Sequence, residues 1–330
     1  MRTASEPAAA AIFTRRRWLA AAAAAGATVA WGVPARAAVP RLPAQKSLKL
    51  FGSTIRYHEL GQAGRRPTLV LLHGLGSSAA GDWGSVMPQL ARTHHVLALD
   101  QLGFGRSDKP FIQYGIQIWV DFLGEFLREK KVGEFMLMGE SLGGWIAAQY
   151  TLQALRGDAA TTLGQSFALP RPNRLVLCDA AGYREAMSGH FDKPPAAPGA
   201  PPSGLGAGPS LAGEKALLAR IFHAPSFNTE ASIRRGLGWS LSKGDSHTIA
   251  SVYSDPAILD ESVDGQLGAI TLPTLIVWGE HDGLIPLALG RRFADEIPGA
   301  RLVVVPGSGH APMIETPQAF LAALGDFLTR

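Results

Sequence analysis

Short runs of apolar residues recur along the chain and alternate with stretches of helical periodicity. A run that is apolar at every position is typical of a parallel strand buried on both faces. Such runs occupy residues 68–72, 96–99, 135–138, 175–178, 274–278 and 301–305. Apolar residues three or four positions apart predict helices at 83–92, 114–130, 142–156, 287–296 and 317–328. Strands that alternate with helices predict an α/β fold, with a mostly parallel, doubly wound sheet covered by helices on both faces.

Two segments depart from this alternation. Residues 48–60 alternate apolar and polar side chains around Gly52-Ser53, which predicts an antiparallel hairpin at the sheet edge. The composition changes at residue 183, and residues 192–213 are crowded with Pro, Gly and Ala, which predicts a loop. Short helices are expected beyond it, at 214–223, 229–242 and 245–254. We therefore predict a core of residues 48–182 and 268–330, interrupted by an inserted, mainly helical lid at 183–267.

Residues 1–37 have the organisation of an export signal. The segment from Thr14 to Leu19 resembles the twin-arginine consensus, and an alanine-rich apolar run follows it that is too short to span a bilayer comfortably. Ala35-Arg36-Ala37 is a small-x-small cleavage site. The sequence predicts an exported chain, periplasmic or secreted, with no stable membrane insertion once the signal is removed. An uncleaved membrane anchor is the alternative.

Composition narrows the classes of partner. The net charge of +4 arises entirely within residues 1–37, and the remainder carries 26 basic and 26 acidic residues, so a nucleic-acid-binding surface is not expected. The single cysteine, Cys178, cannot form an intramolecular disulfide and is expected in the core. The chain has no H-E-x-x-H motif and no cluster with metal-ligand spacing, so we predict neither metal nor cofactor. The oligomeric state stays open.

The segment Gly139-Glu140-Ser141-Leu142-Gly143 carries the strongest chemical signal in the chain. It fits G-x-S-x-G, a motif in which a strand turns sharply into a helix and presents the Ser hydroxyl above the sheet. Glycines are expected on both sides because a Cβ there would collide with the tight turn. An apolar run precedes the motif and a helical pattern follows it, as this turn requires.

Further motifs follow the other predicted strands in a fixed order. They are His73-Gly74-Leu75-Gly76, Asp100-x-x-Gly103-x-Gly105-x-Ser107, Trp278-Gly279-x-x-Asp282 and Gly307-x-Gly309-His310. Together with the Ser141 motif, this order resembles the α/β-hydrolase superfamily over residues 48–330. The resemblance implies Ser141 as nucleophile, His310 as its base and Asp282 as the acid that orients the imidazole. It also implies an oxyanion hole formed by the backbone N–H groups of Leu75 and Leu142.

Other polar residues near these motifs have competing interpretations. Asp179, which ends the preceding strand, is the substitute acid, and Glu280 is a poorer one. His73 is expected to brace the oxyanion turn by hydrogen bonding. The remaining candidates, expected to be structural, are His94, His95, Asp100, Gly103, Gly105, Ser107 and His281.

A Ser nucleophile favours acyl transfer and argues against the branches of the superfamily that attack with Asp. The leading hypothesis is a serine hydrolase that cleaves a small or medium, largely apolar carboxylic ester through an acyl-enzyme. The first alternative is a C–C bond hydrolase of vinylogous diketones, which needs basic groups to hold a substrate carboxylate. The predicted lid contains four basic residues that could do this, Arg220, Arg234, Arg235 and Lys243. Charges of this kind more commonly belong to a solvated face. Export also weighs against a role in a ring-cleavage pathway. The second alternative is a ligand-binding protein without turnover.

Overall fold

The computed structural model describes residues 42–64, 66–157, 168–191 and 210–329. The predicted export signal at 1–37 and most of the predicted loop at 192–213 lie outside these residues. Among the helices that the structure describes, none is long and apolar enough to cross a membrane.

One eight-stranded sheet runs through the molecule in the order β1-β2-β4-β3-β5-β6-β7-β8. The strands are β1 (Lys46–Leu50), β2 (Ser53–Leu60), β3 (Thr68–Leu72), β4 (Val96–Asp100), β5 (Phe135–Glu140), β6 (Arg174–Cys178), β7 (Thr274–Gly279) and β8 (Arg301–Val305). The pairs β1–β2 and β2–β4 are antiparallel, and the other pairs are parallel. The predicted α/β class with a mostly parallel sheet is confirmed, and so is the edge hairpin.

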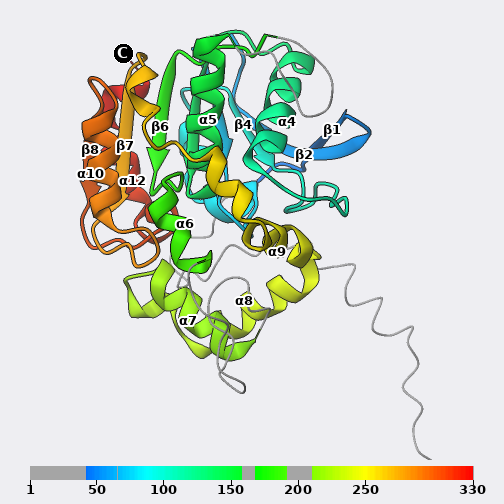
Figure 1. Ribbon diagram of the computed structural model, residues 1–330, viewed down its shortest axis with the longest axis vertical. Coiled ribbons are helices and arrows are strands. Elements are labelled where there is room, and N and C mark those ends of the chain that lie inside the picture. The colour runs from blue at the N-terminus through cyan, green and yellow to red at the C-terminus, as the bar shows by residue number, and fades with distance from the viewer. Residues whose placement is uncertain (1–41, 65, 158–167, 192–209, 330) are drawn as a thin grey trace, which may run out of the picture.

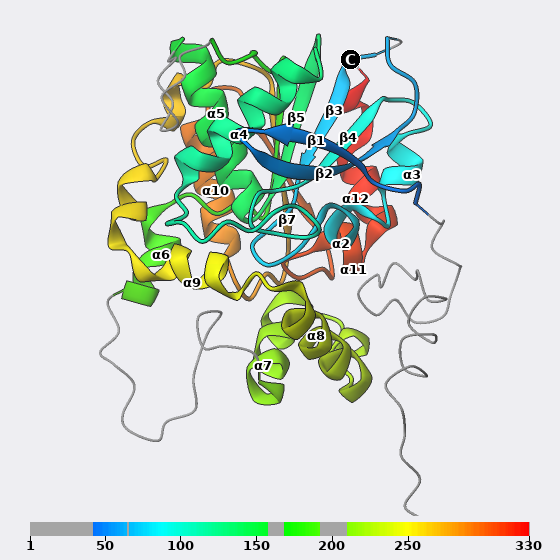
Figure 2. The ribbon, with the colours of Figure 1, turned by 90° about the vertical axis from the view of Figure 1, so that its right-hand side faces the viewer.

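Helices cover both faces of this sheet (Figures 1 and 2). One face carries α4 (Ile116–Glu129), α5 (Leu142–Arg156) and α10 (Leu287–Glu296). The other carries α2 (Ala79–Trp83), α3 (Met87–Leu90), α11 (Pro312–Glu315) and α12 (Pro317–Leu324). Between β6 and β7 the chain forms α6 (Arg184–Phe191), α7 (Leu211–Ile221), α8 (Glu230–Lys243) and α9 (Ser246–Ser254). Short 3₁₀ turns lie at Pro225–Phe227, Pro256–Glu261, Leu267–Ala269 and Gly325–Leu328.

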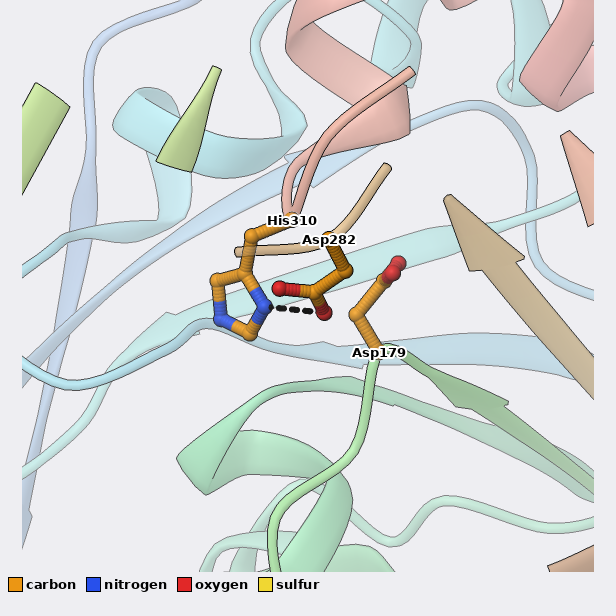
Figure 3. A group of neighbouring side chains, drawn as sticks. All are labelled: Asp179, Asp282 and His310. Atoms are coloured by element: carbon orange, nitrogen blue, oxygen red, sulfur yellow. Dashed lines mark hydrogen bonds and ion pairs between the residues drawn. The ribbon is translucent and has the colours of Figure 1, made fainter. Parts of the chain in front are cut away.

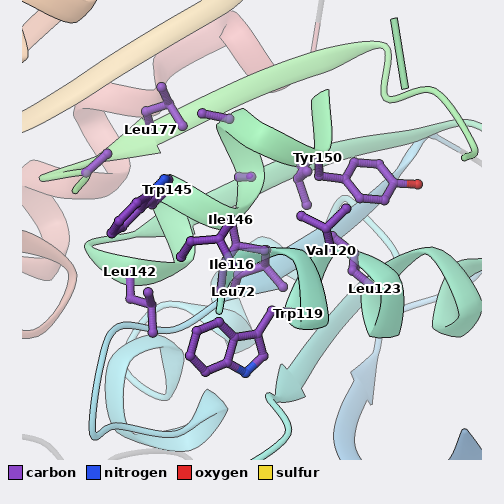
Figure 4. Packing of buried hydrophobic residues seen from close by; sticks show 14 of the residues in the cluster. Leu72, Ile116, Trp119, Val120, Leu123, Leu142, Trp145, Ile146, Tyr150 and Leu177 are labelled. Carbon is purple, nitrogen blue, oxygen red and sulfur yellow. The ribbon is translucent and has the colours of Figure 1, made fainter. Parts of the chain in front are cut away.

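Each face of the sheet has its own hydrophobic core, which explains why the strands are apolar at every position. In β3, Val70 and Leu72 point into the cluster beneath α4 and α5, which Figure 4 shows in part. Leu69 and Leu71, the alternate residues, point into the second cluster with Trp83 of α2. Successive side chains of a strand point to opposite faces, so two covered faces require an uninterrupted apolar run.

Two predicted helices differ from those observed. The helix expected at 83–92 is divided into α2 and α3, because α2 ends at Gly84 and Pro88 lies in the first turn of α3. The helix expected at 317–328 ends as an α-helix at Leu324, since Gly325 has a φ of +48° and the last turn is 3₁₀. Helix α6 was not predicted.

Candidate active site

Ser141 sits on a strained turn between β5 and α5. Its φ of 51° and ψ of −117° are unfavourable for a residue with a side chain. A Cβ at Gly139 would lie 2.1 Å from the carbonyl oxygen of Gly143, and one at Gly143 would lie 2.4 Å from that of Leu72. Both flanking positions therefore require glycine, and the tight packing holds Ser141 at the carboxyl end of the sheet.

The imidazole of His310 is held by Asp282. His310 follows β8 and Asp282 follows β7, and the Nδ1 atom of the ring lies 2.7 Å from Oδ2 of the carboxylate (Figure 3). The other carboxylate oxygen accepts the backbone N–H groups of Leu284 and Ile285, at 2.7 and 2.9 Å. Because Asp282 is acceptor-only when ionised, Nδ1 carries the proton and Nε2 carries the lone pair.

Asp179, the substitute acid considered from the sequence, lies beside Asp282 but has no hydrogen bond to His310. Its Oδ1 accepts the N–H of Gly279 at 2.7 Å, while its buried Oδ2 has no partner. Burial, and then the charge of Asp282, raise the pKa of Asp179 well above the ordinary carboxyl value. Asp179 is therefore a neighbour of the acid–imidazole pair whose surroundings favour its neutral form.

In the part of the chain that the structure describes, one group of side chains has the composition and spacing that could hold a metal ion. It consists of Asp179, Asp282 and His310. One ligand atom from each lies within 4.8 Å of the others. The Nδ1–H group of His310, however, donates a hydrogen bond to Asp282. Because of this hydrogen bond, His310 and Asp282 form an acid–imidazole pair.

The second ring nitrogen of His310 faces the elbow. Nε2 lies 3.3 Å from Oε1 of Glu140, the residue immediately before Ser141. Among the described residues no hydrogen bond joins His310 to Ser141, although both line the same cavity. The structure thus places the three predicted side chains at one edge of the sheet, with Glu140 beside the second ring nitrogen of His310.

The turn after β3 lies against the elbow. A Cβ at Gly74 would be 2.2 Å from Oε2 of Glu140 and 3.1 Å from the Ser141 Cβ. Asp82 of α2 fixes the turn by accepting the N–H of Gly74 at 2.8 Å and by bonding the Ser77 hydroxyl. Leu142 is the first residue of α5, so its N–H has no partner within that helix. Leu75 and Leu142 therefore stay the proposed oxyanion donors.

His73 braces this turn, as expected from the sequence. Its Nε2 accepts the N–H of Gln101 at 3.0 Å, and its Nδ1 lies 2.8 Å from the carbonyl oxygen of Gly74. Burial lowers the pKa of His73 and keeps the ring neutral. Asp100 also has a structural role, because it accepts the N–H groups of Ala79 and Arg106, each at 2.8 Å.

A cavity of about 330 Å³ connects the elbow with the helices inserted between β6 and β7. This volume is at the lower end of the range for small-molecule sites. Apolar side chains from α7 and α9 form much of the wall, with Leu217, Ile221 and Ile249 among them. Ser141 and His310 form part of the floor.

Lys243, at the end of α8, is a cation inside this cavity. Its side chain is 5% exposed, its Nζ donates to the carbonyl oxygen of Gly76, and it lies 3.6 Å from Asp245. Arg234 on the same helix is instead 63% exposed and paired with Glu230. The sequence analysis interpreted Arg234 and Lys243 as charges on a solvated face. This interpretation is wrong for Lys243. Burial lowers the pKa of Lys243, against the opposing effect of Asp245.

The chain matches the family model described as alpha/beta hydrolase fold over residues 67–317. It is 30% identical over 270 residues to a 2-hydroxymuconate semialdehyde hydrolase of Pseudomonas sp. strain CF600, with 79% of this chain and 86% of the relative covered.

Two solved structures are similar to this one over most of the chain. A mutant of the meta-cleavage product hydrolase CumD has 25% identity and a TM-score of 0.67, covering 84% of this chain and 96% of its own. Est816, described as an N-acyl homoserine lactone degrading enzyme, has 26% identity and a TM-score of 0.68, covering 86% of this chain and 100% of its own.

Proposed function

Since the chain belongs to the alpha/beta hydrolase fold family, we propose that this hydrolase cleaves a carbon–carbon bond in a vinylogous diketone that bears a carboxylate. The observation that carries the proposal is the 30% identity over 270 residues to a 2-hydroxymuconate semialdehyde hydrolase. The similarity to a meta-cleavage product hydrolase supports it. The sequence analysis ranked ester hydrolysis first, and these relatives reverse that order.

In the proposed mechanism, Ser141, His310 and Asp282 each have a distinct role. Ser141 Oγ attacks the ketone carbon while Nε2 of His310 takes its proton, and Asp282 stabilises the imidazolium. The N–H groups of Leu75 and Leu142 stabilise the tetrahedral oxyanion. Collapse of the intermediate breaks the C–C bond, and the conjugated leaving group takes the proton from His310. Water, deprotonated by His310, then hydrolyses the acyl-enzyme and regenerates Ser141.

Lys243 supports a substrate with a carboxylate. Its ammonium group lines the cavity that contains Ser141, and it contacts the oxyanion turn through Gly76. An ion pair in a cavity shielded from water is stronger than one at the surface, because the local dielectric constant is lower. We therefore assign Lys243 to the substrate carboxylate and the apolar wall to the rest of the molecule.

Ester or lactone hydrolysis is the second candidate. The apolar side chains of the cavity wall suit an uncharged acyl chain, and Est816 is 26% identical to this chain. The same Ser141, His310 and Asp282 would serve that reaction through an acyl-enzyme.

Turnover of a matched substrate panel tests the proposal. The full chain would be offered a vinylogous diketone with a free carboxylate, its methyl ester, and nitrophenyl esters of short and medium chain length. We expect kcat/KM to be highest for the free carboxylate and to fall by a factor of about 10³ or more in Ser141→Ala. Ester turnover that exceeds diketone turnover would favour the second candidate. Binding without turnover would favour the ligand-binding alternative.

Lys243→Met tests the assignment of the carboxylate. We expect KM for the charged diketone to rise about tenfold to a hundredfold, as for the loss of one buried ion pair, and KM for the nitrophenyl esters to change little. Arg234→Met is the matched control, because it removes an exposed cation from the same helix. An equal effect of Lys243→Met on charged and uncharged substrates would contradict the assignment.

Export of the chain remains a separate proposal, supported by the Arg15-Arg16 pair and the apolar run that follows it. Fractionation of cells that express the wild type and Arg15→Lys/Arg16→Lys tests it. We expect the wild type outside the cytoplasm and the variant retained within it. Cytoplasmic wild-type protein would contradict export and would remove the objection to a ring-cleavage role.

A further inference from the structure

Two consecutive backbone N–H groups in the loop after β8 are bonded to other elements of the fold. The N–H of His310 donates to the carbonyl oxygen of Ile221 at 2.7 Å, and the N–H of Gly309 donates to Oε2 of Glu315 at 2.6 Å. Ile221 is the last residue of α7, and Glu315 is the last residue of α11. The backbone that carries the proposed base is therefore held by two helices.

The Glu315 carboxylate joins this loop to the inserted helices. Its Oε1 accepts the N–H of Ala224, just beyond the end of α7, at 2.5 Å, while its Oε2 bonds Gly309. Ala224 and Glu315 are 91 positions apart in the chain. Hydrogen bonds from N–H groups to an ionised carboxylate are roughly twice as strong as those between neutral groups. One side chain thus bridges two backbone donors from separate segments.

The contact between the loop and the end of α7 leaves no space for a side chain. A Cβ at Gly309 would lie 2.2 Å from the carbonyl oxygen of Ile221 and 2.9 Å from the backbone nitrogen of His223. Both atoms belong to the backbone, so neither can rotate away. A displacement of residues 221–224 would therefore move Gly309, and with it His310.

The loop that carries the acid is bonded to the same helix. The N–H of Gly283 donates to the carbonyl oxygen of Arg220 at 3.1 Å, and Nε of Arg220 donates to the carbonyl oxygen of Gly283 at 3.0 Å. Gly283 directly follows Asp282. The end of α7 is thus bonded beside both members of the acid–imidazole pair, while Leu217 and Ile221 of this helix line the cavity.

We propose that Glu315 is a positioning residue that ties the His310 loop to the end of α7 and so sets the place of the imidazole relative to Ser141. The inserted helices then hold the base in place, in addition to forming the cavity wall. Glu315 is not among the described residues that line the cavity, so it acts through His310 and not on the substrate. The inference rests on the proposed Ser141–His310 pair, but it applies to a diketone and to an ester alike.

Steady-state kinetics of Glu315→Ala with both the diketone and a nitrophenyl ester test this role. We expect kcat to fall about tenfold to a hundredfold with either substrate, because the base is misplaced, and KM to change by less than about threefold. Glu315→Gln keeps one acceptor oxygen but turns its NH₂ group toward the second donor, so we expect an intermediate loss of kcat, about threefold to tenfold.

Two further variants separate the bridge from a general loss of structure. Ala224→Pro removes the donor beyond α7 and leaves the bond to Gly309, at a φ of −72° that proline can adopt, and it should also lower kcat. Glu261→Ala is the matched control, because Glu261 likewise accepts two backbone N–H groups and does not line the cavity among the described residues. It should lower the urea midpoint and leave kcat unchanged.

The outcomes separate this inference from the proposed function. Wild-type kcat in folded Glu315→Ala, or the same kcat as in Glu261→Ala, would show a merely structural residue and overturn the inference. Wild-type kcat in folded Ala224→Pro would overturn the role of the α7 segment. If Glu315→Ala does not fold, an unchanged kcat in Glu315→Gln overturns the inference and a reduced kcat supports it. Turnover in Ser141→Ala that equals the wild type would instead refute Ser141 as the nucleophile.

Discussion

Substitution of Gly143 by Ala should damage the elbow and the oxyanion turn together. The added Cβ would lie 2.4 Å from the carbonyl oxygen of Leu72 and 2.7 Å from that of His73. Both atoms belong to the backbone, so neither can rotate away, and β3 and α5 must separate by several tenths of an ångström. The peptide groups that are displaced lead directly to Leu75, one proposed oxyanion donor, and Leu142 precedes the substituted residue.

The expected magnitude follows from this clash. Overpacking of a rigid interior costs about 1–3 kcal/mol, and we expect the free energy of unfolding of Gly143→Ala to fall by that amount. Gly143 has ordinary helical backbone geometry, so helix propensity alone would favour Ala by about 1 kcal/mol and cannot account for a loss. Misplacement of the oxyanion donors should lower kcat about a hundredfold, with a smaller change in KM.

The assay combines urea unfolding with turnover of the best substrate in the panel. Gly238→Ala is the matched control, because Gly238 also lies in a helix, α8, but a Cβ there would meet nothing within 4 Å. That variant should be as stable as the wild type or about 1 kcal/mol more stable, with unchanged kcat. Wild-type stability and kcat in Gly143→Ala would refute the close approach of α5 to β3.

The remaining predictions concern three carboxyl groups. Asp282→Asn should lower kcat about 10⁴-fold, because Asn favours the wrong tautomer of His310, whereas Asp179→Asn should retain activity; equal losses would contradict the assignment of the acid. The raised pKa of Asp179 means that the folded state keeps a proton that the unfolded state releases above about pH 4, so this group lowers stability as pH rises through that window. Urea unfolding at pH 4 and pH 8 should therefore show Asp179→Asn gaining on the wild type at the higher pH, and a pH-independent difference would contradict this. Glu261→Ala should lower the free energy of unfolding by about 1–2 kcal/mol, and Glu261→Gln by less, because Glu261 accepts the N–H groups of Ile116 and Gln117 at the start of α4; unchanged urea midpoints would refute the cap.

Strand content and the elbow could be predicted because both depend on neighbouring residues. A parallel strand covered on both faces needs an unbroken apolar run, and β3 to β8 lie within one or two residues of the predicted runs. The glycines around Ser141 are dictated by clashes within the turn itself and with β3. The same local signals failed where a single residue ends a helix, as at Gly84 and Gly325.

Other features depend on residues far apart in the chain. Gly115 at the start of α4 offers no capping side chain, and the carboxylate that caps this helix belongs to Glu261, 145 positions beyond Ile116. The burial of Lys243 depends on where α8 packs, since Arg234 on the same helix is exposed. Helix α8 has no strong apolar stripe, so its periodicity does not reveal which face meets the core.

Sequence alone determined the class of the fold and the residue types of the site. Whether a strand is buried on both faces, and whether a turn is tight, both depend on residues adjacent in the chain. Only the tertiary structure decided which acid meets His310, that Glu140 faces its second nitrogen, and that Lys243 enters the cavity. These contacts arise where separate strands and helices end at one edge of the sheet, and their distances are set by packing between segments that are not neighbours in the chain.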